Sequence, residues 1–165
     1  MNRKVWQLGF GTLLLTFGFS PDGAGPTSAW AEPNAVTFPP LDQLEHYTTV
    51  RRGVTREHML TSQAALDALQ AGQPVPAGSH VVLVDYQSDV LERYLVAQKT
   101  GDGIDDWAYQ WFWPDQTVKV DEKVGQCYAC HQRSRREQSY LFTFDDALNF
   151  KESAGHEKPQ SSTSP

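Results

Sequence analysis

Cysteine is scarce in this chain, and both copies lie in one short segment. Among the 165 residues there are only two cysteines, Cys127 and Cys130, so no third cysteine is present from which a disulfide scaffold could be built. Apart from Met1 there is a single methionine, Met59. Long apolar runs are also missing, because the longest such stretch is shorter than the roughly 20 residues that cross a bilayer. These shortages exclude a disulfide-rich fold and favour a soluble protein.

The first 31 residues have the pattern of a secretory signal peptide. Arg3 and Lys4 supply positive charge, residues 5–19 form an uncharged apolar stretch, and Ala29 and Ala31 place small residues at a cleavage site. We therefore expect residues 1–31 to be removed and the mature protein to be periplasmic. An uncleaved N-terminal anchor is the alternative.

The charge balance is acidic. The chain has 14 basic and 20 acidic residues, a net charge of −6, and removal of Arg3, Lys4 and Asp22 with the signal peptide leaves 12 − 19 = −7. An acidic surface argues against nucleic acid and against anionic lipid membranes as partners. An acidic surface is compatible with docking to a basic redox partner protein. Assembly into a homodimer is also possible on this sequence.

The middle of the chain predicts strands and one helix. Residues 63–71 are rich in alanine and leucine, Ser62 can cap them and Gly72 can end them, so we expect a helix that buries Leu66 and Leu69. β-Branched and alternating apolar residues predict strands at 80–86, 91–99 and 107–113, with one or two more between 50 and 61. The fold class expected is α+β, mainly antiparallel β.

Residues 45–150 are predicted to form one domain. Prolines at positions 33, 39 and 40 make residues 32–44 an extended lead-in. The polar residues 151–165 are expected to be a disordered tail.

The segment Cys127-Tyr128-Ala129-Cys130-His131 carries the clearest chemistry. Cys-x-x-Cys-His is the attachment site of c-type haem. Two thiols on a single turn can form thioethers with the two vinyl groups of a porphyrin, and the adjacent His131 can bind the iron as proximal ligand. We therefore expect one covalent haem c.

Three other interpretations of these cysteines are open. A zinc site needs four ligands, and the other histidines are scattered. A thioredoxin-type dithiol follows the first strand of its domain, whereas this pair lies late in the chain. The third alternative is a plain structural cysteine pair beside an accidental histidine.

Three further segments carry a family resemblance. Residues 74–78 (Pro-Val-Pro-Ala-Gly), residues 107–112 (Trp-Ala-Tyr-Gln-Trp-Phe) and residues 139–143 (Ser-Tyr-Leu-Phe-Thr), with the late haem motif between the last two, resemble the cytochrome P-460 family, which includes the cytochromes c-prime-beta. The resemblance covers roughly residues 45–145. It implies a curved antiparallel sheet packed against helices, haem on one face of the sheet, and a five-coordinate iron open to small ligands.

The sequence departs from the enzymatic branch of that family. True cytochromes P-460 bind the haem a third time through a lysine and oxidise hydroxylamine, whereas the c-prime-beta members lack that bond and bind gases. Val84 stands where the resemblance places the lysine, and Lys99 on the following strand is the only nearby substitute. We expect Lys99 to be a solvated strand end.

Candidates for the rest of the haem pocket are few. Met59 is the only methionine that could be a distal ligand, and His58, on the opposite face of the same strand, is the alternative distal ligand. Arg56 could donate to a bound oxyanion or a haem propionate. Trp111 belongs to an aromatic strand face that could cover a porphyrin or form ordinary core; the members of this face are Trp107, Tyr109, Trp111 and Trp113. Three arginines after the motif could reach propionates or a partner, or form an exposed loop: Arg133, Arg135 and Arg136.

Three functions follow from these residues. The preferred one is reversible binding of a small ligand such as nitric oxide at five-coordinate iron. Electron transfer would require Met59 or His58 as second axial ligand. Oxidation of hydroxylamine or a similar nitrogen compound would make the protein a haem oxidoreductase, with a crosslink at Lys99.

Overall fold

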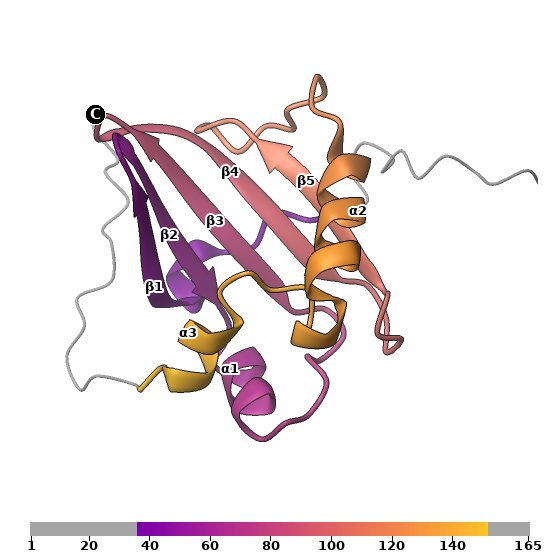
Figure 1. Ribbon diagram of the computed structural model, residues 1–165. Helices are drawn as coiled ribbons and strands as arrows, with labels where there is room; N and C mark the ends of the chain where they lie inside the picture. The colour runs from indigo at the N-terminus through magenta and orange to yellow at the C-terminus, as the bar shows by residue number, and fades with distance from the viewer. Residues whose placement is uncertain (1–35, 152–165) are drawn as a thin grey trace, which may run out of the picture.

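Five strands form one open antiparallel sheet whose spatial order follows the chain, β1-β2-β3-β4-β5 (Figure 1). The fold comes from a computed structural model, which describes residues 36–151. An α+β fold dominated by antiparallel strands confirms the class predicted from the sequence. The strands are β1 (Glu45–Arg52), β2 (Thr55–Thr61), β3 (His80–Gln87), β4 (Val90–Lys99) and β5 (Trp107–Phe112).

Helices lie on one face of this sheet (Figure 1). α1 (Gln63–Gln70) begins at Ser62, whose Oγ accepts from the backbone N–H of Ala65 at 3.2 Å, and it buries Leu66 and Leu69 as predicted. α2 (Val124–Arg135) carries the Cys-x-x-Cys-His motif, and α3 (Phe144–Asn149) is a short helix that the sequence analysis did not predict.

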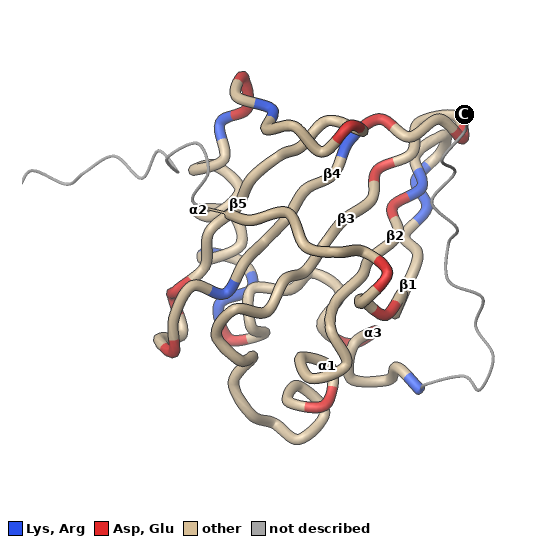
Figure 2. The backbone as a smooth tube through the Cα atoms, turned by 180° about the vertical axis from the view of Figure 1, so that it is seen from behind, with Lys and Arg blue, Asp and Glu red and all other residues tan. Residues whose placement is uncertain are grey.

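Period-two alternation along the strands produces two apolar cores, one on each face. Val81, Ala97 and Tyr109 face the helices. Val82, Val96 and Phe112 face the opposite way and are covered by residues 36–44 (Figure 2). The described part of the predicted lead-in, residues 36–44, contains a 3₁₀ turn at Leu41–Gln43 and closes the second core.

Two sequence predictions lie outside the described residues, namely the signal peptide and all but the first residue of the disordered tail. Within residues 36–151, none of the helices has the length and apolar character needed to span a bilayer.

Candidate functional site

α2, which carries the motif residues, packs against β5 (Figure 1). Cys127, Cys130 and His131 are separated by three and four positions, and such residues are neighbours on a helix surface. Both thiols are free and half-buried. The two thiols and the imidazole therefore lie within about one turn of α2, and of the three residues only His131 lines the cavity described next.

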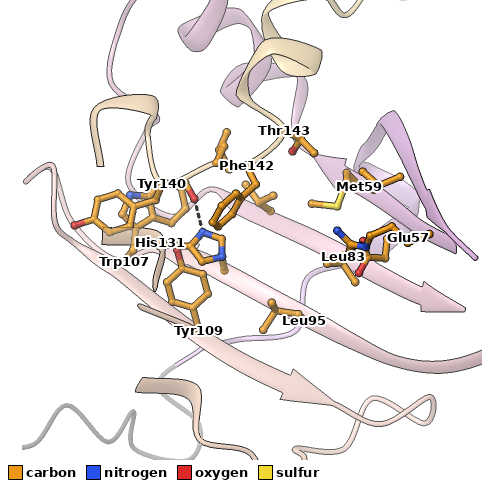
Figure 3. Close-up of a pocket in the computed structure, with 15 residues that line it drawn as sticks. Glu57, Met59, Leu83, Leu95, Trp107, Tyr109, His131, Tyr140, Phe142 and Thr143 are labelled. Atoms are coloured by element: carbon orange, nitrogen blue, oxygen red, sulfur yellow. Dashed lines mark hydrogen bonds and ion pairs between the residues drawn. The ribbon is translucent and has the colours of Figure 1, made fainter. Parts of the chain in front are cut away.

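His131 faces an apolar cavity between the sheet and the segment that follows α2 (Figure 3). The cavity has a volume of about 170 Å³, and the open space including its mouth is about 720 Å³. Pockets that enclose a whole ligand span roughly 300–1,000 Å³, so the enclosed part of this cavity is smaller than such a pocket. All five strands contribute to the wall, which is made of Val50, Arg52, Glu57, Met59, Val81, Leu83, Leu95, Ala97, Trp107, Tyr109, His131, Tyr140, Leu141, Phe142 and Thr143.

The His131 imidazole is fixed by one hydrogen bond. Its Nδ1 lies 2.5 Å from the backbone carbonyl oxygen of Tyr140. Because a carbonyl can only accept, Nδ1 carries the proton and donates, and the lone pair is left on Nε2. Burial lowers the pKa of the imidazole, while the Tyr140 carbonyl acts in the opposite direction. The side chain is therefore held as a neutral ligand with a free Nε2.

Cys127 lies beside Trp111 and packs against the core on the helical face. Burial raises the pKa of its thiol, although a hydrogen bond from Trp111 acts to lower that pKa. A redox-active dithiol requires a lowered thiol pKa. This environment therefore gives no support to the thioredoxin-type interpretation.

The Tyr109 hydroxyl is buried and has no hydrogen-bond partner among the described residues. Its ring centroid lies 4.9 Å from that of His131, and burial together with the nearby Cys127 and Cys130 raises its pKa. A buried hydroxyl without a partner costs about 1–3 kcal/mol. Together, the orphaned hydroxyl, the apolar cavity and the free Nε2 fit a site completed by a bound group, and the two thiols and imidazole are the donor set of haem c.

Bare metal binding has less support. No group of three or more His, Cys, Asp and Glu side chains that could hold a metal ion occurs within residues 36–151. The zinc interpretation thus gains no ligand set from the fold.

Two charged residues stand out in the cavity wall, and both come from the β1–β2 hairpin. Arg52 donates through Nη2 to Glu57 Oε2. The Arg52 side chain is 66% exposed and that of Glu57 is 13% exposed, so the arginine lies at the mouth of the cavity and the carboxylate further inside. Neither residue was singled out in the sequence, although Glu57 shares the strand face of Met59 at a spacing of two.

Met59 lines the same cavity as His131, whereas His58 does not (Figure 3). The sequence correctly predicted that these two neighbours point to opposite faces. His58 packs on the far face of the sheet with Tyr86, at a ring-centroid distance of 5.6 Å, and with His46. His58 therefore does not line the cavity that His131 faces, and the fold gives no support to the prediction that it is a distal ligand.

Arg56 is also on the far face. Its guanidinium carbon lies 4.7 Å from the centroid of the Tyr86 ring, and Nη1 pairs with Asp89 at 2.8 Å. It does not reach the cavity, because residues at even positions of β2 point away from α2. Arg52 is the arginine that borders the cavity, where the sequence analysis expected Arg56.

The histidine pair on the far face predicts sensitivity to acid. His58 Nδ1 lies 3.2 Å from His46 Nε2, and both nitrogens lie 2.8 Å from Thr49 Oγ1. Burial, followed by the charges of His46, Arg56 and Arg51, lowers the pKa of His58 to about 4. Between pH 6.5 and pH 4 the unfolded chain therefore binds a proton that the folded chain does not, and the free energy of unfolding falls as the pH falls through this window.

Between pH 7 and pH 4.5 the free energy of unfolding should fall by about 1 kcal/mol less in His58→Gln than in the wild type. This figure is smaller than the full effect of the pKa shift because the ring is partly exposed to solvent. Urea unfolding of both proteins at pH 4.5 and pH 7 measures it. An identical difference between the two pH values in variant and wild type would contradict the prediction.

Lys99 differs from its prediction. We expected a solvated strand end, but the side chain is only 3% exposed. Nζ donates to the carbonyl oxygens of Gly101, at 2.7 Å, and of Gly103, and lies 5.8 Å from the centroid of the Trp107 ring. The ammonium is satisfied inside the β4–β5 loop and is not part of the cavity wall. Val84 is likewise remote from the cavity, because it belongs to the core on the far face.

The aromatic strand face is divided between three environments. Trp107 and Tyr109 line the cavity, and Trp111 lies under Arg93, whose guanidinium carbon is 4.3 Å from the ring centroid. Trp113 lies beyond the end of β5 and is 38% exposed. Trp111 therefore supports Cys127 and does not form part of the cavity wall.

The arginines after the motif do not form one exposed loop. Arg133 and Arg135 belong to α2, and the guanidinium carbon of Arg135 lies 4.7 Å from the centroid of the Phe142 ring. Arg136 pairs with Asp105 through two nitrogens. The Arg136–Asp105 pair ties the β4–β5 loop to the end of α2.

The chain matches no protein-family model and no curated protein sequence. The resemblance to the cytochrome P-460 family therefore remains a prediction based on the motifs.

Proposed function

We propose that this chain is a periplasmic mono-haem c-type cytochrome that binds a small ligand, such as nitric oxide, at a five-coordinate iron. The observation that carries the proposal is the His131 imidazole, which presents a free Nε2 to an apolar cavity and has two free thiols within about one turn of the same helix. Cys127 and Cys130 would hold the porphyrin through thioethers, and His131 would bind the iron. When bound, the haem supplies a metal with one protein ligand and one exchangeable position.

The composition of the cavity wall favours an exchangeable small ligand over a second protein ligand on the iron. His131 is the only imidazole among the wall residues of the described chain, and Glu57 is engaged by Arg52. An uncharged diatomic ligand suits such an apolar environment, because it loses little solvation on entering. Arg52, at the mouth, would be the arginine to pair with a haem propionate.

The test is to produce the full chain in a bacterial host that matures c-type cytochromes. We expect a mass increase of one haem on the processed chain, a high-spin ferrous spectrum, and a shifted Soret band when nitric oxide is added. The Cys127→Ser/Cys130→Ser variant is the control that should remain colourless. Wild-type protein with unmodified thiols would overturn the proposal.

Electron transfer is the second candidate, because Met59 lines the cavity and thioether sulfur is a known haem ligand. If Met59 bound the iron, the wild type would be low-spin and Met59→Leu would convert it to high-spin. Our proposal predicts the same high-spin spectrum for both proteins. A wild-type low-spin spectrum that Met59→Leu abolishes would decide for the electron carrier.

Hydroxylamine oxidation is less favoured. The lysine expected to form the extra crosslink, Lys99, is held by two carbonyl groups of its own loop. Digestion of the haem protein should accordingly leave haem on the peptide of residues 127–131 alone.

A further inference from the structure

The residue that accepts the His131 hydrogen bond has an unfavourable backbone conformation. Ser139 and Tyr140 have φ values of +52° and +63°, in the left-handed region that non-glycine residues rarely adopt. Residues in this conformation persist only where their surroundings hold them. Tyr140 is also almost fully buried. Other groups must therefore hold this turn in the shape that brings the carbonyl to His131.

The Tyr140 side chain is held by Asp105, from a different part of the chain. The Tyr140 hydroxyl donates to Asp105 Oδ1. The same carboxylate accepts two hydrogen bonds from Arg136, from Nε to Oδ1 at 2.6 Å and from Nη2 to Oδ2 at 2.9 Å. Hydrogen bonds from Arg136 and Tyr140 lower the pKa of Asp105 to about 2, so the carboxylate is ionised at any physiological pH.

A second contact joins the same loop to α2. The Tyr128 hydroxyl, from the helical turn between the two cysteines, donates to the backbone carbonyl of Asp105 at 3.1 Å. The Tyr128 and Tyr140 rings lie 5.7 Å apart between centroids. Asp105 thus connects the loop before β5 to the turn that bears the two thiols and to the turn that holds the imidazole.

We propose that Asp105 is a positioning residue for the His131 ligand, because it anchors the Tyr140 hydroxyl and so fixes the carbonyl that accepts from Nδ1. The inference rests on the proposed function, in which Nε2 binds iron. When the imidazole nitrogen that does not bind the metal donates a hydrogen bond, the ligating nitrogen becomes more basic. Weakening that hydrogen bond therefore weakens the metal–nitrogen bond. Asp105 would in this way tune the iron from outside the cavity.

The test compares Asp105→Asn and Tyr140→Phe in the haem-loaded protein. Tyr140→Phe removes only the hydroxyl and keeps the buried ring, so it tests the anchor even if Asp105→Asn fails to fold. Asp102→Asn, an exposed carboxylate of the same loop, is the matched control. The measurements are the iron–imidazole stretching frequency of the ferrous protein by resonance Raman spectroscopy and the reduction potential.

We expect both variants to lower the stretching frequency and to raise the potential, with no change in Asp102→Asn. The double variant should add little to Tyr140→Phe, because Tyr140→Phe already removes the hydroxyl through which Asp105 acts. Haem-loaded variants that are less stable but unchanged in frequency and potential would show a merely structural role and overturn the inference while leaving the proposed function intact. A wild type without haem would overturn both.

Discussion

Replacing His131 with glycine should abolish protein ligation of the iron while the haem stays attached through Cys127 and Cys130. The imidazole is the proposed ligand, and the fold holds it in a defined tautomer because Nδ1 donates to the Tyr140 carbonyl. We expect complete loss of the iron–imidazole stretching band and a changed Soret maximum. Free imidazole added to the variant should restore both, because the deleted side chain leaves a space of its own shape beside the same carbonyl.

His58→Gly is the matched control for this experiment. It deletes the same side chain from a histidine that faces the opposite side of the sheet. The control should keep the wild-type spectrum and should not respond to added imidazole. A wild-type spectrum in His131→Gly, or the same change in His58→Gly, would show that the ligand has been assigned to the wrong residue.

Local patterns were sufficient to predict most of the sheet. The alternation in β2 separates Met59 from His58, and the Ser62 cap with Gly72 marks the limits of α1. Such signals depend on neighbours in sequence, and these neighbours stay neighbours in the fold. What alternation cannot indicate is which face of the sheet α2 covers, because that depends on how α2 packs. Arg56 and His58 were assigned to the site for this reason.

The supporting contacts of His131 could not have been predicted from the sequence. Asp105 and Tyr140 are 35 positions apart, and their contact depends on the packing of α2 against β5. Lys99 was misjudged for a similar reason, since lysines at strand ends are normally solvated and only the path of the β4–β5 loop supplies it with carbonyl partners. α3 did have a local signal, the acidic residues Asp145 and Asp146 in its first turn, which favour a helix N-terminus.

Preventing haem attachment should cause the largest loss of stability. In Cys127→Ser/Cys130→Ser the cavity of about 170 Å³ has no group to fill it. At about 24 cal/mol per Å³, an enclosed apolar cavity of this size costs about 4 kcal/mol when unfilled, and this is the upper limit for the present cavity, which opens to solvent. Folded domains have total stabilities of only about 5–15 kcal/mol, so a loss of this order is a large fraction of the total. We expect the midpoint of thermal unfolding to fall by about 10 °C.

Ala129→Ser provides the control for that experiment, because it changes one exposed residue between the two cysteines and keeps both thiols. It should retain the haem and unfold near the wild-type temperature. The comparison separates the effect of the missing haem from that of altering α2, whose single fully buried residue is Val124. If the double serine variant unfolded at the wild-type temperature, the cavity would not be a site that a bound group completes. The argument from the orphaned Tyr109 hydroxyl would then lose its basis.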